Sequence, residues 1–221
     1  PLLEYIQVQD LEYHRPLLEL IENNLDSVST VVEQKLSPAV IASSHRVRED
    51  NLTSILVDQY LERGNQLFDS GDVRGGIAVL SYAASLLPKH ARANSQLADR
   101  FAQLEQLEKA VGFYVKAVNV DNDMVSAHRS LGFLFLRTNR VANSIIHFEE
   151  ALRIEPQDLQ SAMYLADILS THPSDTVRNG SRAMELVAVM MQQGGEGNWQ
   201  VLVTAAAALA AGDQFDQAIQ A

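Results

Sequence analysis

The sequence predicts an all-α fold in which helical hairpins stack on one another, and two observations lead to this prediction. A pattern of apolar and small residues recurs every 34 positions along the chain. Within each copy, the apolar positions have the spacing that places them on one face of a helix. A fixed period of about 20 to 50 residues is typical of repeat architectures, which act mainly through their surfaces.

Three consecutive copies of the pattern lie between residues 57 and 158. The middle copy contains Leu97, Ala98, Phe101, Ala110, Tyr114 and Ala117, and the residues 34 positions later are Leu131, Gly132, Phe135, Ser144, Phe148 and Ala151. The residues 34 positions earlier are Arg63, Gly64, Leu67, Gly76, Leu80 and Ala83. Each copy therefore provides one face of a first helix and one face of a second helix.

Small residues and turn residues divide each copy into a helical hairpin. Positions such as Gly132 and Ala117 are small where two helix backbones must come close, and aromatic residues fill the space beside them. The segments 70–72 and 138–139 carry turn residues between the two helices. Pro88 and Pro156 mark the end of the second helix, because proline cannot continue a helix interior.

At these residues the chain resembles the tetratricopeptide repeat family. That family's pattern is Leu-Gly/Ala, an aromatic three residues on, then a small residue, an aromatic, Ala and Pro at fixed spacings, and residues 128–156 match it at nearly every position. The first copy departs from it at Arg63 and Leu80. The resemblance implies a right-handed α–α superhelix whose first helices line a concave groove.

The period divides the chain into repeats and an N-terminal region. We expect repeats over 57–90, 91–124, 125–158 and 159–197, and a partial fifth repeat over 198–221. In the fourth repeat the second helix is delayed by about five residues, because Ala183, Val187 and Met190 come later than the period requires. The resemblance of its longer connection to terminal repeats of bacterial members of the family suggests a bacterial source.

Residues 1–56 do not follow the period, yet their apolar residues have helical spacing. We expect amphipathic helices between Leu2 and Leu36 and another over Arg48–Gln59. These extra N-terminal helices either cap the open end of the stack or connect it to an upstream domain. Since the chain lacks an initiator Met and ends inside a predicted helix, we expect it to be a piece of a longer protein.

The composition excludes several classes of function. The net charge is -11, so the chain lacks the basic surface that nucleic acids require, and we expect no nucleic-acid partner. No apolar run is long enough to cross a bilayer, so no membrane insertion is expected in this segment. There are no cysteines, which excludes thiolate chemistry but leaves the compartment open.

No catalytic or metal-binding motif is present in the sequence. The histidines are His14, His45, His90, His128, His147 and His172, and no two share a helix face at a spacing of three or four. We expect them to be surface or partly buried polar residues. Nucleophile-elbow, phosphate-loop and zinc-protease strings are absent too. We therefore predict no cofactor, no metal site and no enzymatic activity.

The family resemblance also indicates which side chains would contact a partner. In the family, ligand contacts come mainly from fixed positions on the first helix of each repeat. Carried over to this chain, the candidate partner-binding residues are Asn65, Phe68, Arg92, Asp99, Arg129, Phe133, Met163 and Asp167, together with the nearby Arg137. They combine cationic, acidic and apolar side chains.

The three arginines of this set have two interpretations. They either pair with Asp58, Asp99 and Asp167 across adjacent helices, which we favour slightly, or hold a carboxylate of a partner.

The family's chaperone-binding members grip a C-terminal carboxylate with Lys, Asn and Arg. The equivalent residues here are Leu61, Asn65, Gln96, Ser126 and Ser130. Only Asn65 fits, so we predict no chaperone clamp.

The predicted function is that of a protein-interaction scaffold binding a peptide or helix of a partner in the concave groove. The alternative is a non-catalytic accessory region of a larger enzyme or transport assembly. Self-association through the C-terminal repeat is a third expectation, because Leu202, Ala205, Ala206 and Leu209 lack a following helix to cover them.

Overall fold

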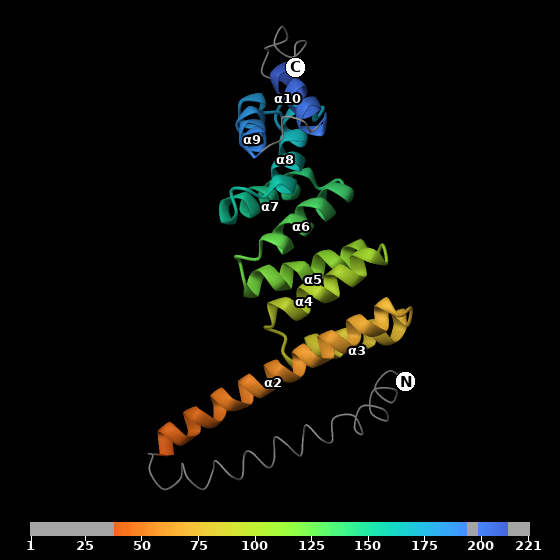
Figure 1. Cartoon of the computed structure of the whole chain (residues 1–221), viewed down its shortest axis with the longest axis vertical. Coiled ribbons are helices and arrows are strands. Elements are labelled where there is room, and N and C mark those ends of the chain that lie inside the picture. Colours follow the sequence, from red (N-terminus) through yellow and green to blue (C-terminus); the bar gives the residue numbers. More distant parts are fainter. Residues whose placement is uncertain (1–37, 194–198, 212–221) are drawn as a thin grey trace. The chain divides into compact units, whose positions relative to one another are not determined.

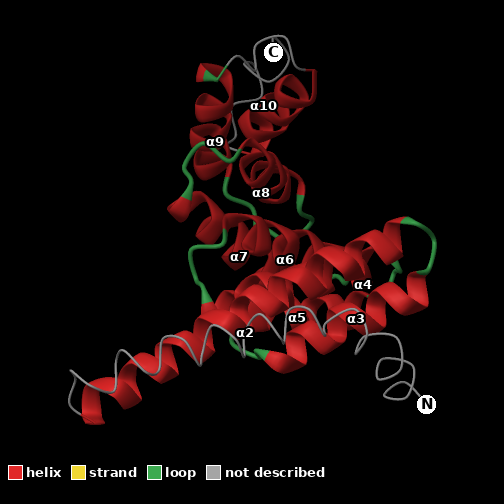
Figure 2. Cartoon of the chain, turned by 60° about the horizontal axis from the view of Figure 1, so that its bottom comes forward, coloured by secondary structure: helices red, strands yellow, loops and turns green. Residues whose placement is uncertain are grey.

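The computed structural model describes residues 38–193 and 199–211, and every regular element in these ranges is an α-helix (Figure 1, Figure 2). The helices are α2 (Pro38–Asp69), α3 (Val73–Leu86), α4 (Ala91–Gln103), α5 (Leu107–Val120), α6 (Val125–Arg137), α7 (Val141–Ile154), α8 (Leu159–Thr171), α9 (Gly180–Gln192) and α10 (Trp199–Ala211). The chain forms two compact units, Pro1–Leu97 and Ala98–Ala221, and the boundary between them falls inside α4. The predicted all-α repeat fold is confirmed.

Helix α2 leads from the N-terminal region into the first repeat without a break. Its 32 residues pass through the point between residues 56 and 57 where the repeat pattern begins. The helix expected over Arg48–Gln59 is therefore part of α2. The helices expected over 2–36 lie outside the described residues. Near its C-terminal end, α2 buries Val57, Tyr60 and Leu61 in the hairpin that it forms with α3.

Two glycines allow α2 and α3 to approach each other closely. A Cβ atom built on Gly76 would lie 2.7 Å from Cβ of Phe68 and 2.8 Å from the carbonyl oxygen of Gly64. A Cβ atom on Gly64 would lie 2.7 Å from Cγ of Leu80, which is fully buried. Real Cβ atoms do not approach other atoms so closely, so the small residues that recur in the sequence are a packing requirement at these positions.

The same contact recurs in the second compact unit. A Cβ atom on Gly132 of α6 would lie 2.7 Å from the ring of Phe148 on α7, and this ring is fully buried. Phe148 also stacks on Tyr164 of α8, with ring centroids 5.6 Å apart and ring planes 13° apart. Phe148 thus joins one repeat to the next, and its core cluster continues through α8 and α9 to Val201 and Ala205 of α10.

The turn between the two helices of a repeat uses a residue in the left-handed backbone region. Gly71, Glu105 and Asn139, each 34 residues after the last, have φ angles of 95°, 58° and 57°. The same position in the fourth repeat is Pro173, whose ring fixes φ at about -65°. The short turn cannot form there. A longer connection instead leads to α9, whose start at Gly180 confirms the predicted delay.

Helix α10 is covered better than the sequence suggested. It packs against both α8 and α9. Ala205 and Leu209 are buried, with exposed fractions of 5% and 9%, while Leu202 and Ala206 are partly exposed. The expectation that all four residues form an uncovered face is therefore wrong for Ala205 and Leu209, because the fourth repeat supplies the surface on which they pack.

The close approach at Gly76 gives a stability prediction with a matched control. Alanine normally stabilises a helix interior by about 1 kcal/mol relative to glycine. At Gly112 on α5, a Cβ atom would meet nothing within 4 Å, so Gly112→Ala should raise the free energy of unfolding by about 0.5–1 kcal/mol. Gly76→Ala should instead lower it by about 1–3 kcal/mol, because backbone atoms must move apart.

Urea unfolding of the parent chain and both variants, followed by circular dichroism, measures this difference. Equal stabilisation by the two substitutions would show that the helices of the first hairpin do not touch at Gly76.

Candidate functional site

All nine side chains predicted to contact a partner are at least partly exposed. Three lie in the first compact unit and six in the second: Asn65, Phe68 and Arg92, then Asp99, Arg129, Phe133, Arg137, Met163 and Asp167. Every one of them is on the first helix of a repeat, namely α2, α4, α6 or α8. Their contacts show which of them are already engaged within the chain.

In the first unit, the polar candidates bond to residues of the neighbouring repeat. Nη1 of Arg92 donates to Oδ1 of Asp58 at 3.2 Å, and both side chains remain largely exposed. Nδ2 of Asn65 donates to Oε1 of Gln96 at 2.9 Å. The first helices of successive repeats are thus bridged by polar contacts, and the predicted pairing of Arg92 with Asp58 is confirmed.

In the second unit, the two arginines of α6 also form ion pairs within the chain. Arg129 binds Asp158, which is only 6% exposed and which caps α8 by accepting a hydrogen bond from the Ser161 amide at 3.3 Å. Arg137 binds Glu105, at 2.5 Å between Nη2 and Oε2, across the turn that follows α4. The expected pairing of these arginines with Asp99 and Asp167 is therefore wrong. Asp158 at the start of α8 and Glu105 in the turn after α4 pair with the two arginines instead.

One aromatic ring of the candidate set is exposed on α6. Phe133 is 38% exposed, and its ring lies 5.6 Å from the ring of Tyr164, centroid to centroid. The guanidinium of Arg137 lies 5.8 Å from the Phe133 centroid, within the range of a cation–π contact. Met163, next to Tyr164 on α8, is half-buried at the edge of the core cluster. The ring is thus held in place by its neighbours while one side faces solvent.

Two acidic candidates, Asp99 and Asp167, form no ion pair among the described residues, although the charge of Arg100 acts on Asp99. The hydroxyl of Tyr114 donates to Asp99, and partial burial raises the pKa of the Asp99 carboxyl in spite of this bond. Partial burial also raises the pKa of Asp167. Burial and the Asp99 charge raise the pKa of Tyr114, so its hydroxyl stays protonated and donates.

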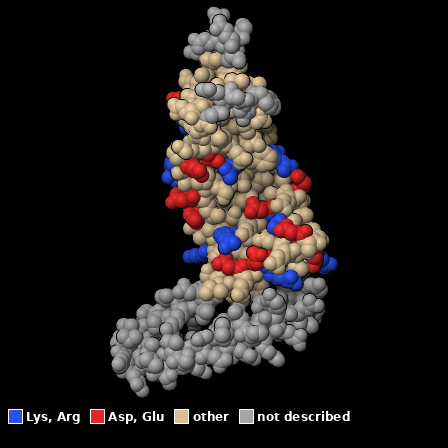
Figure 3. All heavy atoms as spheres, in the orientation of Figure 1, with Lys and Arg blue, Asp and Glu red and all other residues tan. Residues whose placement is uncertain are grey.

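Charged side chains elsewhere on the surface are mostly neutralised by neighbours. On the face drawn in Figure 3, acidic and basic side chains lie next to each other in several places. The exposed pairs include Arg140 with Glu108 and Arg182 with Glu149. No described helix is both long enough and apolar enough to cross a membrane.

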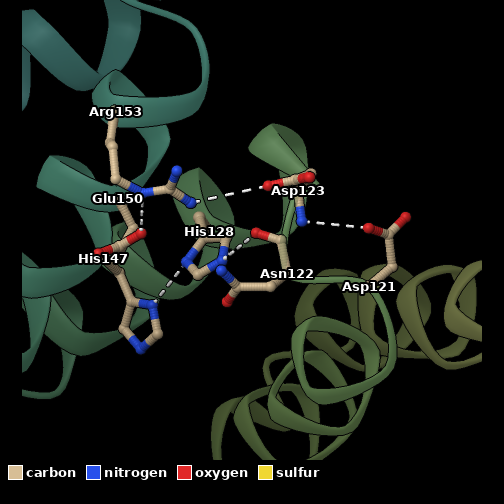
Figure 4. A network of polar contacts seen from close by, with 7 residues as sticks. All are labelled: Asp121, Asn122, Asp123, His128, His147, Glu150 and Arg153. Carbon is tan, nitrogen blue, oxygen red and sulfur yellow. Dashed lines mark hydrogen bonds and ion pairs between the residues drawn. The ribbon is translucent and has the colours of Figure 1, made fainter.

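Two histidines that are distant in the sequence meet between α6 and α7 (Figure 4). Nδ1 of His128 lies 3.0 Å from Nδ1 of His147, and the His147 ring stacks on Phe135. His128 is 3% exposed, so the expectation that it is a surface or partly buried residue is wrong. Within the described ranges, no group of three or more side chains suited to metal binding lies together.

The hydrogen bonds of this pair fix where its protons are. Nε2 of His128 faces the carbonyl oxygen of Asn122 at 3.1 Å, and a carbonyl can only accept, so this nitrogen carries a hydrogen. In neutral His128, Nδ1 is therefore an acceptor, and Nδ1 of His147 donates to it. If both rings were protonated, the N–H group at Nδ1 of His128 would face the N–H group at Nδ1 of His147, and the hydrogen bond between the rings would be lost. Burial lowers the pKa of both rings, that of His147 to about 4, with the charge of His128 adding to the effect.

The histidine pair predicts a loss of stability on mild acidification. The pKa of His147 is about 4 in the folded chain and 6.5 when unperturbed, so the unfolded chain binds protons first as the pH falls. The stabilisation is complete above pH 6.5 and is lost between pH 6.5 and about 4. The charged groups near the pair are Glu150, Arg153 and Asp123, which are joined to one another by ion pairs (Figure 4).

Urea unfolding at about pH 7 and about pH 5 tests this prediction, because unperturbed histidines titrate between these values. The parent should lose more stability over this interval than His147→Gln, which keeps a polar side chain but cannot take up a proton there. If the two chains lose the same amount, the histidine pair does not contribute to the pH dependence.

Comparison with known proteins identifies the fold. No known sequence family matches the chain, and no curated protein matches it in sequence. Solved structures do match: MamA protein has a TM-score of 0.64 and 15% identity, with 74% of this chain and 86% of that one covered. YrrB, described as a TPR protein with an unusual peptide-binding site, has a TM-score of 0.61 and 15% identity, covering 73% and 80% of the two chains.

A region of an O-GlcNAc transferase from Thermobaculum terrenum also matches, with a TM-score of 0.52 and 16% identity. The match covers 63% of this chain and 26% of the transferase. Identities this low establish the fold alone, and the bacterial source suggested by the sequence stays a prediction. The repeat pattern, the helical hairpins and these matches together show that the chain has the tetratricopeptide repeat fold.

Proposed function

We propose that the chain is a non-enzymatic protein-interaction scaffold, and that the first helices of its repeats hold a peptide or helix of a partner protein. The observation that carries this proposal is the exposed ring of Phe133. Among the described residues, Phe133 is the one aromatic side chain in the set of exposed large hydrophobics. Aromatic side chains contribute much of the binding energy at protein interfaces.

The surroundings of Phe133 suit a role as an anchor. The ring rests on Tyr164 and under the Arg137 guanidinium, so little side-chain freedom remains to be lost when a partner covers it. Tyr164 is itself stacked on the buried Phe148, which ties the anchor to the core. An exposed ring with rigid support gains apolar burial on binding at a low entropic cost.

The ion pairs of the arginines bear on the kind of partner. Arg92, Arg129 and Arg137 all have carboxylate partners within the chain. An acidic peptide would have to displace these ion pairs before the arginines could bind it. Asn65, the single residue that fits the chaperone clamp, is hydrogen-bonded to Gln96. These contacts support a partner other than a chaperone's acidic C-terminal tail.

The likeness to YrrB adds support of a general kind, because YrrB is described as having a peptide-binding site.

A second candidate function is that of a non-catalytic accessory region in a larger enzyme or transport assembly. The likeness to about a quarter of an O-GlcNAc transferase chain favours it, since a region of similar fold then occurs within a larger enzyme. In that case the repeats would position another domain of the same assembly.

Capture of partners from a cell lysate, analysed by mass spectrometry, tests the scaffold proposal. The parent chain should be compared with Phe133→Ala and with Ile146→Ala, which removes a 59% exposed apolar side chain from the second helix α7. Loss of an anchor should cost about 2 kcal/mol or more, a weakening of at least about thirtyfold. Partners should therefore be retained by the parent and by Ile146→Ala and lost from Phe133→Ala.

Circular dichroism of the two variants verifies that each is folded. Retention of every partner by Phe133→Ala would contradict the proposal, and loss from Ile146→Ala alone would move the binding surface to the second helices.

A further inference from the structure

Three residues of the candidate surface occupy the same position in successive repeats. Asp99 on α4, Phe133 on α6 and Asp167 on α8 are each separated by 34 residues. All three are exposed, and all lie within the second compact unit. The exposed aromatic ring is thus flanked on the two neighbouring first helices by carboxylates at the equivalent position.

Contacts with neighbouring side chains connect the three positions. Phe133 touches Tyr164, which lies one turn before Asp167 on α8. On the other side, the Tyr114 hydroxyl donates to Asp99 and is also hydrogen-bonded to Ser130, one turn before Phe133 on α6. Tyr114 of α5 therefore links α4 to α6, and Tyr164 lies where α6 contacts α8. We call the three equivalent residues Asp99, Phe133 and Asp167 the row.

The charge of this row is negative. The arginines of α6, Arg129 and Arg137, are neutralised by Asp158 and Glu105. Arg100, next to Asp99 in the sequence, donates to Gln103 on its own helix. Within the part of the chain that the structure describes, neither Asp99 nor Asp167 takes part in an ion pair. A partner that brought an acidic side chain to this row would meet two carboxylates that form no ion pair, of which Asp99 is offset in part by the charge of Arg100.

We propose that the partner segment carries an apolar side chain for Phe133 and a lysine or arginine on each side of it for Asp99 and Asp167. This inference rests on the proposed function, since it specifies the chemistry of the peptide held on the first helices. Neighbouring packed helices lie about 8–10 Å apart, and an extended chain advances about 3.3 Å per residue. The basic residues therefore lie about three positions before and after the apolar one.

The protonation behaviour of the carboxylates agrees with this assignment. Partial burial raises the pKa of both Asp99 and Asp167 above the ordinary value. Removal of water strengthens the attraction between a carboxylate and a cation placed beside it. Both carboxylates therefore gain more from a bound cation than fully hydrated surface acids do.

Selection from a displayed library of random peptides tests the inference without a known partner. Peptides of about twelve residues are long enough to cross three first helices in an extended conformation. The parent should enrich peptides in which an apolar residue stands between two basic ones at the stated spacing. The double variant Asp99→Asn, Asp167→Asn should still enrich the apolar residue but lose the basic ones, because asparagine keeps the shape and removes the charge.

Affinities of the most enriched peptide, measured by fluorescence anisotropy, complete the test. Asp99→Asn and Asp167→Asn should each weaken binding about fivefold to tenfold, as expected for a partly desolvated ion pair. Asp121→Asn makes the same charge change at the exposed end of α5 and should leave the affinity unchanged. Added salt should weaken the parent more than the double variant.

The outcomes separate the two proposals. Enrichment that depends on Phe133 but shows no preference for basic residues, or a preference for acidic ones, overturns the inference and leaves the proposed function standing. If the parent enriches no peptide relative to Phe133→Ala, both proposals fail.

Discussion

The close contact between the two helices of the first and third repeats is the constraint on which the rest of the structure depends. At Gly64 and Gly76 in the first hairpin, and at Gly132 in the third repeat, there is no room for a Cβ atom. These two hairpins are therefore fixed at the point where their helices come closest. In the second compact unit, Phe148 fills the space next to Gly132 and carries the packing onward to Tyr164. Equivalent residues of successive repeats then come into register on one row.

Polar contacts between repeats reinforce this register. Arg92 with Asp58, Arg137 with Glu105 and Arg182 with Glu149 join residues 34, 32 and 33 positions apart. Exposed ion pairs of this kind contribute about 0–1 kcal/mol each, so they add little to stability. Their effect on function is larger, because they neutralise the arginines on the first helices. The carboxylates that have no such partner then set the charge that a binding segment meets.

Most of the fold could be predicted from the sequence because it depends on local rules. The 34-residue period, the small residues at close contacts and the turn residues all report on backbone geometry, and the structure has the helices and the delayed α9 where these rules place them. The replacement of the turn residue by Pro173 explains the delay in the same terms. The length of α2 was harder to predict, since the start of a repeat pattern does not require the start of a helix.

The partners of individual side chains could not be predicted in the same way. Arg129 reaches Asp158, a helix-capping residue 29 positions away, and the repeat period gives no indication of this contact. His128 and His147 are 19 residues apart on different helices, and only the packing of α6 against α7 brings them together. A repeat period describes which residues are equivalent, whereas these contacts join residues that are not.

The most direct test of the central idea, that the first helices form the binding surface, is a map of amide chemical shifts in the isotope-labelled chain before and after a binding peptide is added. Shifts should concentrate on α4, α6 and α8 around Asp99, Phe133 and Asp167, all at one repeat position. Shifts concentrated on the second helices α5, α7 and α9 would contradict it.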